Sequence, residues 1–454
     1  MARENDLGRD PIRPLVWRIA LPSMLAQCVS VLYSIVDRMY IGHIAEVGDL
    51  ALAGVGVCGP VVTLLSAFAM LIGVGGAPLM GIRMGEKKNG EAERILSTCF
   101  WAVVAISLTL TAVLIPLRRP MLLLFGASEV TLPYAEEYFT VYLTGTVCAL
   151  LATGMSQFII CQGYAKMSMA AVMLGAVANI ILDPIFIFGL NMGVAGAALA
   201  TVVAQTMSCV LVITFLMKKS TVRIRLRIFD RQVLMQVVKL GLTPFIIYAL
   251  DNIMIIAMNA VLQRYGGPGQ GDILVTCATI AQSFMLVVTM PLGGITGGTE
   301  CILSFNYGAR NTQRIREAQK HICLLAVTFT ALMTLAAWVL GDAFAGLFTQ
   351  DAAIRREAVR AIRICALAVV PLAVQYVIVD GFTGMALVKY ALPLSSFRKA
   401  IYFVALFILP ALFGAEATFF AETISDIIPP LVTTIVYLTQ MPRIMREREA
   451  SVSS

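Results

Sequence analysis

A few acidic side chains interrupt long apolar stretches of this sequence, and they have the clearest potential for chemistry. Asp37 and Asp183 lie in the first half of the chain, and Asn179 stands four residues before Asp183. A carboxylate near the centre of a bilayer costs on the order of 3 kcal/mol, so such a residue is functional by default when it faces other helices. The chemistry open to it is reversible binding of a proton or another cation.

The spacing of these residues favours a shared site in the first half. Asn179 and Asp183 lie on one face of a helix, because residues four apart are one turn apart. Pro184 has no N–H, which can leave a carbonyl oxygen free for a cation. Asp37 and Asp183 are each expected toward the outer end of a span, at similar depth. Two carboxylates close together in a low dielectric cannot both ionise cheaply.

The second half has acidic residues of its own. Asp251 is expected in the middle of the seventh span and Asp380 in the inner part of the tenth. They are candidates for a substrate site or a second cation site, and structural hydrogen bonding between helices is the alternative. The roles of three further acids stay open: Glu300, Glu422 and Asp426.

The elements that carry these residues are membrane-spanning helices. Hydrophobic residues make up 59% of the 454 residues and charged residues 13%, whereas soluble domains have roughly half and roughly a quarter. A spanning helix needs about 20 largely apolar residues, and this criterion predicts an all-α integral membrane protein with twelve transmembrane helices. The predicted spans are 15–41, 51–82, 95–116, 136–160, 167–190, 194–217, 236–263, 273–306, 318–340, 360–388, 395–413 and 417–440.

The basic residues predict the orientation of the spans. Most of the 34 Lys and Arg residues fall at the termini and in even-numbered loops. Lys389, Arg398 and Lys399 are counted with the loop between the tenth and eleventh spans, although the last two lie at the start of the eleventh. The positive-inside rule then places both termini in the cytoplasm of a multi-pass plasma or inner-membrane protein. The charged first residues show no cleavage site, so we expect no removable signal peptide. The net charge of +7 reflects this topology, and we expect no nucleic-acid partner.

The two halves of the sequence repeat each other. Pro22 and Pro244 are 222 positions apart, Gly75 and Gly298 are 223 apart, and Gln205 precedes Asp426 by 221. We therefore predict two six-helix bundles related by a pseudo-two-fold axis along the membrane normal. Each repeat has an even number of spans, so both repeats enter the membrane from the same side. The predicted limits are 1–217 and 236–441 for the bundles, 218–235 for a basic cytoplasmic linker and 442–454 for a cytoplasmic tail.

Several ordered motifs resemble the multidrug and toxic compound extrusion (MATE) family over the whole chain. The first half contains LPSML, VDRMYIGHI, DLALAGVG and GVGGAPLMGIRMGEKKN, followed by NIILDPIFIFGLNMGVAGAALATVVAQ. The second half contains PLGGITGGTECILSFNYGARN and, near the end, SDIIPP. TGMALVKYALPLSSFRKAIYF and FGAEATFFAET depart from the glycine-rich pattern of the best-studied branches.

The resemblance implies a secondary antiporter that exports amphipathic, often cationic, small molecules while H⁺ or Na⁺ runs inward. It further implies that Asp37, Asn179 and Asp183 form the coupling site for the proton or for Na⁺, and that occupation of this site bends the first helix. The alternative is that Asp37 pairs with Arg38 or Arg264 and that Asp183 makes an interhelical hydrogen bond. No cofactor is expected beyond the coupling ion, and the protein is expected to be a monomer in the lipid bilayer.

Apolar side chains are the candidates for an adaptable substrate cavity, chief among them Met155, Tyr248 and Phe284, although packing is the commoner role of such residues. The ten cysteines are interpreted as small buried hydrophobes. His43 and His321 are expected at opposite membrane faces, so we predict no joint metal or catalytic site.

Other functions require different sequence features. A flippase for lipid-linked saccharides is the main alternative, and such proteins tend to have arginines in their cavity, whereas the basic residues here are assigned almost entirely to loops. An intramembrane hydrolase needs a nucleophile and base or an HExxH motif, and neither is found. We therefore predict a transporter and not an enzyme, with a receptor or scaffold as a remote alternative.

Overall fold

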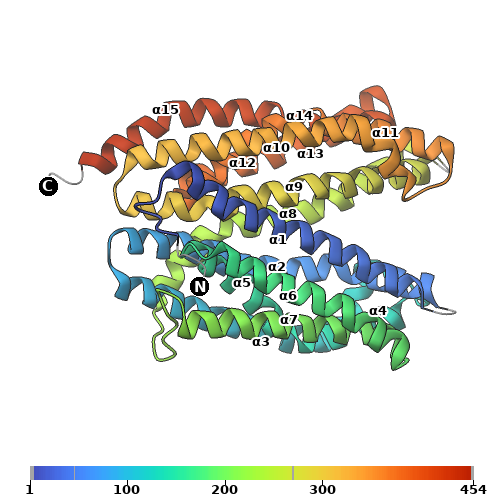
Figure 1. Cartoon of the computed structure of the whole chain (residues 1–454). Coiled ribbons are helices and arrows are strands. Elements are labelled where there is room, and N and C mark those ends of the chain that lie inside the picture. Colours follow the sequence, from blue (N-terminus) through green and yellow to red (C-terminus); the bar gives the residue numbers. More distant parts are fainter. Residues whose placement is uncertain (1–4, 45–46, 268–269, 451–454) are drawn as a thin grey trace. The chain divides into compact units, whose positions relative to one another are not determined.

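A computed structural model describes residues 5–44, 47–267 and 270–450 (Figure 1). Within these ranges the chain forms helices joined by turns, and no residue lies in a strand. Ten helical segments are long and apolar enough to cross a membrane, and two bent helix pairs raise the number to as many as twelve. The prediction of an all-α multi-pass membrane protein is confirmed.

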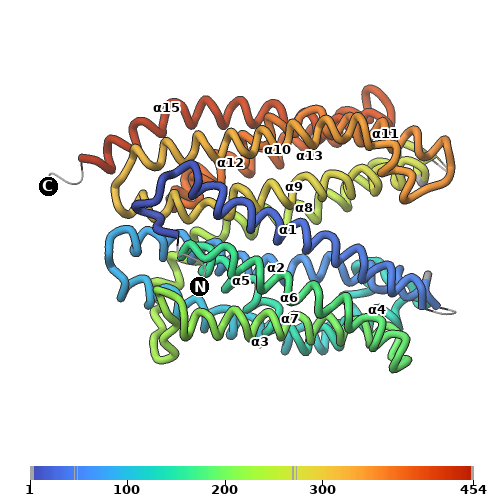
Figure 2. Tube along the Cα trace, viewed as in Figure 1, coloured from blue at the N-terminus to red at the C-terminus, as the bar shows by residue number. Residues whose placement is uncertain are grey.

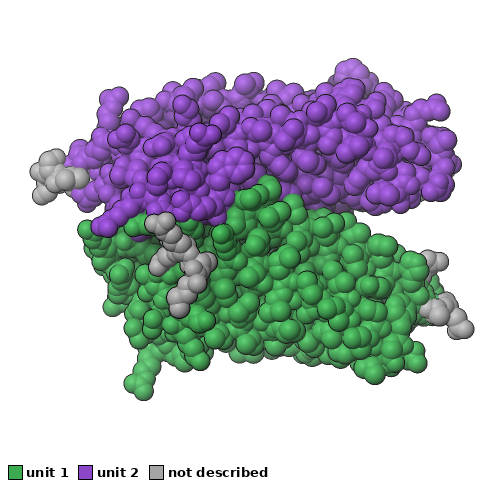
Figure 3. Space-filling model, viewed as in Figure 1, with its two compact units in different colours: residues 1–7, 21–248 green, residues 8–20, 249–454 purple. Residues whose placement is uncertain are grey.

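The chain divides into two compact units, coloured separately in Figure 3. Unit 1 comprises Met1–Leu7 and Leu21–Tyr248. Within it, α2 packs on α3 and α5, and α7 packs on α4, α5 and α6; the tube in Figure 2 shows α6 and α7 side by side. Its elements are α1 (Ile12–Gly42) from residue 21, α2 (Gly48–Gly85), α3 (Asn89–Leu124), α4 (Leu132–Thr144), α5 (Thr146–Cys161), α6 (Ala165–Pro184), the π-helical turn η1 (Ile185–Gly189), α7 (Gly193–Lys218) and α8 (Arg231–Gly266) up to residue 248.

Unit 2 comprises Gly8–Ala20 and Ala249–Ser454. Here α9 packs on α10, α11 and α12, while α15 packs on α12 and α13. A core of buried apolar side chains from α8, α9, α10, α11 and α13 holds this unit together. Its further elements are α9 (Gln270–Gly308), α10 (Thr312–Gly346), α11 (Ala352–Ala366), α12 (Val369–Gly384), α13 (Val388–Phe413), the 3-10 turn η2 (Ala415–Phe419), α14 (Phe420–Ser425) and α15 (Ile428–Ala450).

The basic segment 218–235 is packed on unit 1. Gln162, the residue directly after α5, donates from Nε2 to the Val222 carbonyl oxygen at 3.2 Å and accepts from the Val222 N–H at 2.7 Å. Arg225 pairs with Glu93 of α3 at 3.1 Å. The bundle limits at this segment stay a prediction, and residues 1–4 and 451–454 of the predicted cytoplasmic termini lie outside the described residues.

Two predicted spans are bent pairs of helices. The span predicted at 136–160 is divided into α4 and α5, which meet at 61°, and α11 and α12 meet at 45°. The span predicted at 360–388 starts too late, because α11 begins at Ala352 with a charged, amphipathic turn that a hydropathy window excludes. Asp351 caps this helix, since its Oδ1 accepts hydrogen bonds from the N–H groups of Ala353 and Ile354.

Gly241 marks a close approach between α8 and α2 within unit 1. A Cβ atom at this position would lie 1.7 Å from the Leu71 carbonyl oxygen, a backbone atom that cannot rotate away. We expect Gly241→Ala to lower the free energy of unfolding by about 1–3 kcal/mol, the usual cost of overpacking. The apparent unfolding midpoint of purified protein in detergent measures this effect.

Gly293 provides the matched control. It also lies inside a long helix, α9, but a Cβ atom there would meet nothing within 4 Å. Gly293→Ala should leave the midpoint unchanged or raise it, because Ala is favoured over Gly in helices by roughly 1 kcal/mol. If both substitutions lower the unfolding midpoint equally, the close contact between α8 and α2 is not the reason why Gly241→Ala is destabilising.

Candidate functional site

Asn179 and Asp183 are buried side by side on α6. Asn179 is 2% exposed and Asp183 is fully buried, and the Asn179 side chain donates from Nδ2 to Oδ1 of Asp183 at 3.0 Å. Their spacing of one helical turn makes this contact. Pro184 ends the α-helix directly after Asp183, and the chain continues as η1, in which the Leu190 N–H donates to the Ile185 carbonyl oxygen.

Asp37 of α1 completes a cluster of oxygen atoms with these two residues. Its carboxyl group lies close enough to that of Asp183 for the two to interact electrostatically. Within the described ranges, no donor reaches Asp37 Oδ1, Asn179 Oδ1 or Asp183 Oδ2, although all three atoms are buried. Because two facing carboxylate oxygens are both acceptors, the pair needs a proton or another cation to be stable in this buried setting.

Polar side chains of α4 and α7 continue this region from Asp37. Tyr138 of α4 lies near Thr201 of α7 and close enough to Asp37 for an electrostatic interaction. Tyr142 makes the corresponding contact with Gln205, whose buried Oε1 has no donor in the described protein. Four helices, α1, α4, α6 and α7, therefore contribute polar groups to one region of unit 1.

These tyrosines and their partners were missed by the sequence analysis. A signal was present, because Tyr138 and Tyr142 are four residues apart, as are Thr201 and Gln205. Each pair therefore lies on one helix face, as Asn179 and Asp183 do. Sequence alone did not indicate that these faces meet.

The composition of the cluster suits a proton or a hard cation. Two carboxylates and an amide provide oxygen ligands, which hard cations prefer over nitrogen or sulfur. In the parts of the chain that the structure describes, no group of three or more His, Cys, Asp or Glu side chains is placed to hold a metal ion. All ten cysteines have free thiols.

Two basic residues of α13 require a correction. Arg398 and Lys399 were assigned to a cytoplasmic loop, but they lie inside α13, where their side chains are 13% and 5% exposed. Lys399 pairs with Asp251 of α8, and Arg398 pairs with Asp426 at 2.8 Å. The assignment failed because a basic residue was taken as a loop signal, whereas here each base is neutralised by an acid of a neighbouring segment.

Three further acids of unit 2 have polar neighbours. Asp380 of α12 lies close to Thr296 of α9 and interacts electrostatically with Glu300. Glu422 contacts Cys365 and lies close to Asp426. Asp426 is thus fully buried, Asp380, Glu300 and Glu422 are partly buried, and Asp251 already has a cationic partner. A role for Asp251 or Asp380 in substrate or cation binding stays a prediction.

The apolar candidates for a substrate cavity are separated in the structure. Met155 of α5 is fully buried in unit 1, and Tyr248 of α8 is partly buried there. Phe284 of α9 is 4% exposed in the core of unit 2, with its ring edge-on to Phe344 at 5.3 Å. Met155 and Phe284 therefore pack as core residues, and their contact with substrate stays a prediction.

A protein-family model for MatE matches the chain twice, over residues 22–185 and 245–408. Each limit of the second match lies 223 positions after that of the first. This spacing agrees with the offsets between Pro22 and Pro244 and between Gly75 and Gly298, so the internal duplication is confirmed.

Curated relatives match over nearly the full length. "Multidrug export protein MepA" of Staphylococcus aureus (strain NCTC 8325 / PS 47) is 26% identical over 441 residues, which cover 95% of this chain and 94% of that protein. The protein of the same name from Staphylococcus haemolyticus (strain JCSC1435) is 25% identical over 337 residues, covering 73% and 72%.

Solved structures share the fold. An outward-facing conformation of a multidrug resistance MATE family transporter of the MOP superfamily has a TM-score of 0.89 at 23% identity, covering 97% of this chain and 98% of that one. A MOP superfamily transporter from Pyrococcus furiosus, described as having a binding pocket of reverse polarity, has a TM-score of 0.89 at 22% identity, covering 96% and 98%.

Proposed function

Because the chain belongs to the MatE family, we propose that it is a secondary exporter of amphipathic, often cationic, compounds, driven by inward movement of H⁺ or Na⁺. Two relatives that match most of the chain are multidrug export proteins by name. The proposal places both termini in the cytoplasm and treats the monomer as the functional unit.

The observation that carries the proposal is the carboxyl pair of Asp37, which is half-buried, and Asp183, which is fully buried. The two carboxyl groups lie close to each other, and with Asn179 they present three buried oxygens that no donor among the described residues reaches. Leaving such atoms unsatisfied costs free energy, so a proton or Na⁺ that binds between them stabilises the conformation in which they meet. This arrangement is what an ion-driven conformational change requires.

Asp37 and Asp183 are contributed by different helices, and this links ion binding to helix position. Asp37 is on α1 and Asp183 is on α6. We propose that occupation of the site favours the contact between the two helices and bends α1, and that release of the ion favours another position. An ion can shift this equilibrium only by its difference in affinity for the two conformations. Substrate affinity changes with the same equilibrium.

A transport assay with imposed gradients tests the proposal. Purified protein in liposomes should move a cationic dye when a proton or a sodium gradient is imposed alone, and the gradient that works identifies the coupling ion. Liposomes with neither gradient are the control. Transport that proceeds equally without any ion gradient would contradict the proposal.

A flippase for lipid-linked saccharides is less well supported. Two buried bases, Arg398 and Lys399, do lie among the helices of unit 2. Each is already paired with an acid, so neither offers a free positive charge to a pyrophosphate. Normal levels of lipid-linked precursors in a deletion strain would exclude this function.

A further inference from the structure

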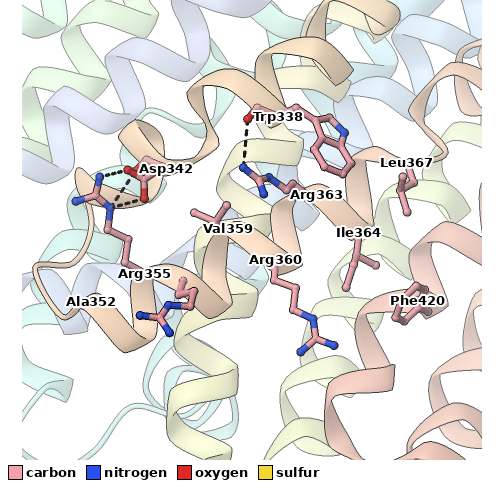
Figure 4. Close-up of a pocket in the computed structure, with 11 residues that line it drawn as sticks. Trp338, Asp342, Ala352, Arg355, Val359, Arg360, Arg363, Ile364, Leu367 and Phe420 are labelled. Atoms are coloured by element: carbon pink, nitrogen blue, oxygen red, sulfur yellow. Dashed lines mark hydrogen bonds and ion pairs between the residues drawn. The ribbon is translucent and has the colours of Figure 1, made fainter.

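A cavity of about 840 Å³ lies in unit 2 (Figure 4). One face of α11 forms its largest wall, because the lining residues of that helix recur at intervals of three and four. Four of them are arginines. The α11 face consists of Ala352, Arg355, Arg356, Val359, Arg360, Arg363 and Ile364, and Trp338 and Asp342 of α10, Leu367 and Phe420 complete the lining.

Acidic neighbours balance only two of the four arginines. Arg355 forms an ion pair with Asp342, and Arg360 pairs with Glu416 at 2.7 Å and approaches Glu357 at 3.8 Å. Among the described residues, no carboxylate lies within ion-pair distance of the other two, Arg356 and Arg363. The cavity therefore has two guanidinium groups that no protein carboxylate neutralises.

The guanidinium group of Arg363 is held beside Trp338 and uses only part of its N–H donors there. Its Nη2 donates to the Trp338 carbonyl oxygen at 3.3 Å, as Figure 4 shows, and its guanidinium carbon lies 5.0 Å from the centre of the Trp338 ring. The Nε–H is buried and has no acceptor in the described protein. A guanidinium group has five N–H donors, so further donors of Arg363 are available to an oxygen-rich anion in the cavity.

An exposed apolar strip leads to the arginines. On α10, Leu335 is 60% exposed, Trp338 49% and Val339 69%, and these residues share one helix face. Two further lining residues, Leu367 and Phe420, are also exposed. In a membrane protein such side chains contact lipid acyl chains. Charged groups thus lie next to a surface suited to hydrocarbon.

We propose that this cavity binds an anionic phospholipid, with the phosphodiester at Arg356 and Arg363 and an acyl chain along the strip of Leu335, Trp338 and Val339. Guanidinium groups match phosphate oxygens in charge and geometry. A soluble phosphate matches only the arginines, whereas a phospholipid matches both the arginines and the adjoining apolar strip, and this favours the lipid. Under the predicted orientation the bound lipid lies in the outer leaflet.

Native mass spectrometry of the purified full-length protein tests this site without any transport assay. Phosphatidylglycerol and phosphatidylcholine with identical acyl chains are titrated separately. Wild-type protein should bind phosphatidylglycerol more tightly, and the double substitution Arg356→Gln with Arg363→Gln should weaken that binding about tenfold or more, the loss expected for charge-assisted hydrogen bonds. Binding of phosphatidylcholine should not change.

Three controls keep the result interpretable. Arg443→Gln with Arg446→Gln removes the same charge from exposed positions of α15 and should leave phosphatidylglycerol binding intact. An unchanged unfolding midpoint shows that the cavity variant is folded. Equal affinity for the two lipids, or undiminished binding by the cavity variant, overturns the proposal. Displacement of the lipid by millimolar inorganic phosphate would also overturn it, in favour of a soluble anion.

Discussion

Asp183→Asn is expected to reduce ion-driven export by roughly 10- to 100-fold, the range that corresponds to typical coupling free energies of 1–3 kcal/mol. Asn retains the size and hydrogen-bonding capacity of the side chain, but it can neither release a proton nor contribute a negative charge to a bound cation. The contact with Asp37 then no longer changes with ion occupancy. Uptake of a cationic dye into energised everted vesicles, which corresponds to export from the cell, measures the loss.

A binding measurement separates lost coupling from a merely structural defect. Dye affinity of the wild type should change with pH or with sodium concentration, whereas the affinity of the Asp183→Asn protein should respond to neither. Asp37→Asn should behave similarly, because it removes the other carboxylate of the pair.

Asp230→Asn is a suitable matched control for this prediction. Asp230 accepts hydrogen bonds from the N–H groups of Gln232 and Val233 at the start of α8, and Asn caps helices equally well. Its export and ion response should be those of the wild type. Full ion-dependent export by Asp183→Asn, at normal expression, would show that the carboxyl pair is not the coupling site.

Arg398→Met should cause the largest loss of stability among the substitutions considered. The Arg398 side chain is 13% exposed, and its partner Asp426 is fully buried with Oδ2 lacking a donor. Removal of one member of a buried ion pair leaves the other charge without compensation, at a cost of about 3–5 kcal/mol. We expect the apparent unfolding midpoint to fall by roughly 3–5 °C for a chain of this length, as measured by thermal denaturation in detergent.

A double substitution and a surface pair test the cause of that loss. Arg398→Met combined with Asp426→Leu removes both charges and should recover most of the stability, since apolar replacements of a buried pair are often neutral. Arg443→Met breaks an exposed pair with Glu447, whose side chains are 76% and 64% exposed, and should cost at most about 0.5 kcal/mol. If the double variant is as unstable as Arg398→Met alone, the buried charge is not responsible.

Composition and periodicity were enough to predict the membrane fold. Apolar length identifies spans because a helix must satisfy its backbone internally in lipid, and the repeat offset followed from a few Pro and Gly positions. The Asn179–Asp183 hydrogen bond was also foreseeable, because helical geometry alone brings these side chains together. The charged start of α11 was missed, since a hydropathy criterion excludes an amphipathic turn.

The tertiary structure decided which helix faces meet. Tyr138, Gln205 and Asp37 come from three helices, and Lys399 reaches Asp251 across 148 residues of sequence. A helical period determines which residues share a face, but the partner of that face depends on packing between distant segments. The sequence by itself therefore determined the spans, the repeat and the acids within them. The structure alone determined that Asp37 meets Asp183, whereas Asp251 and Asp426 are paired with buried bases.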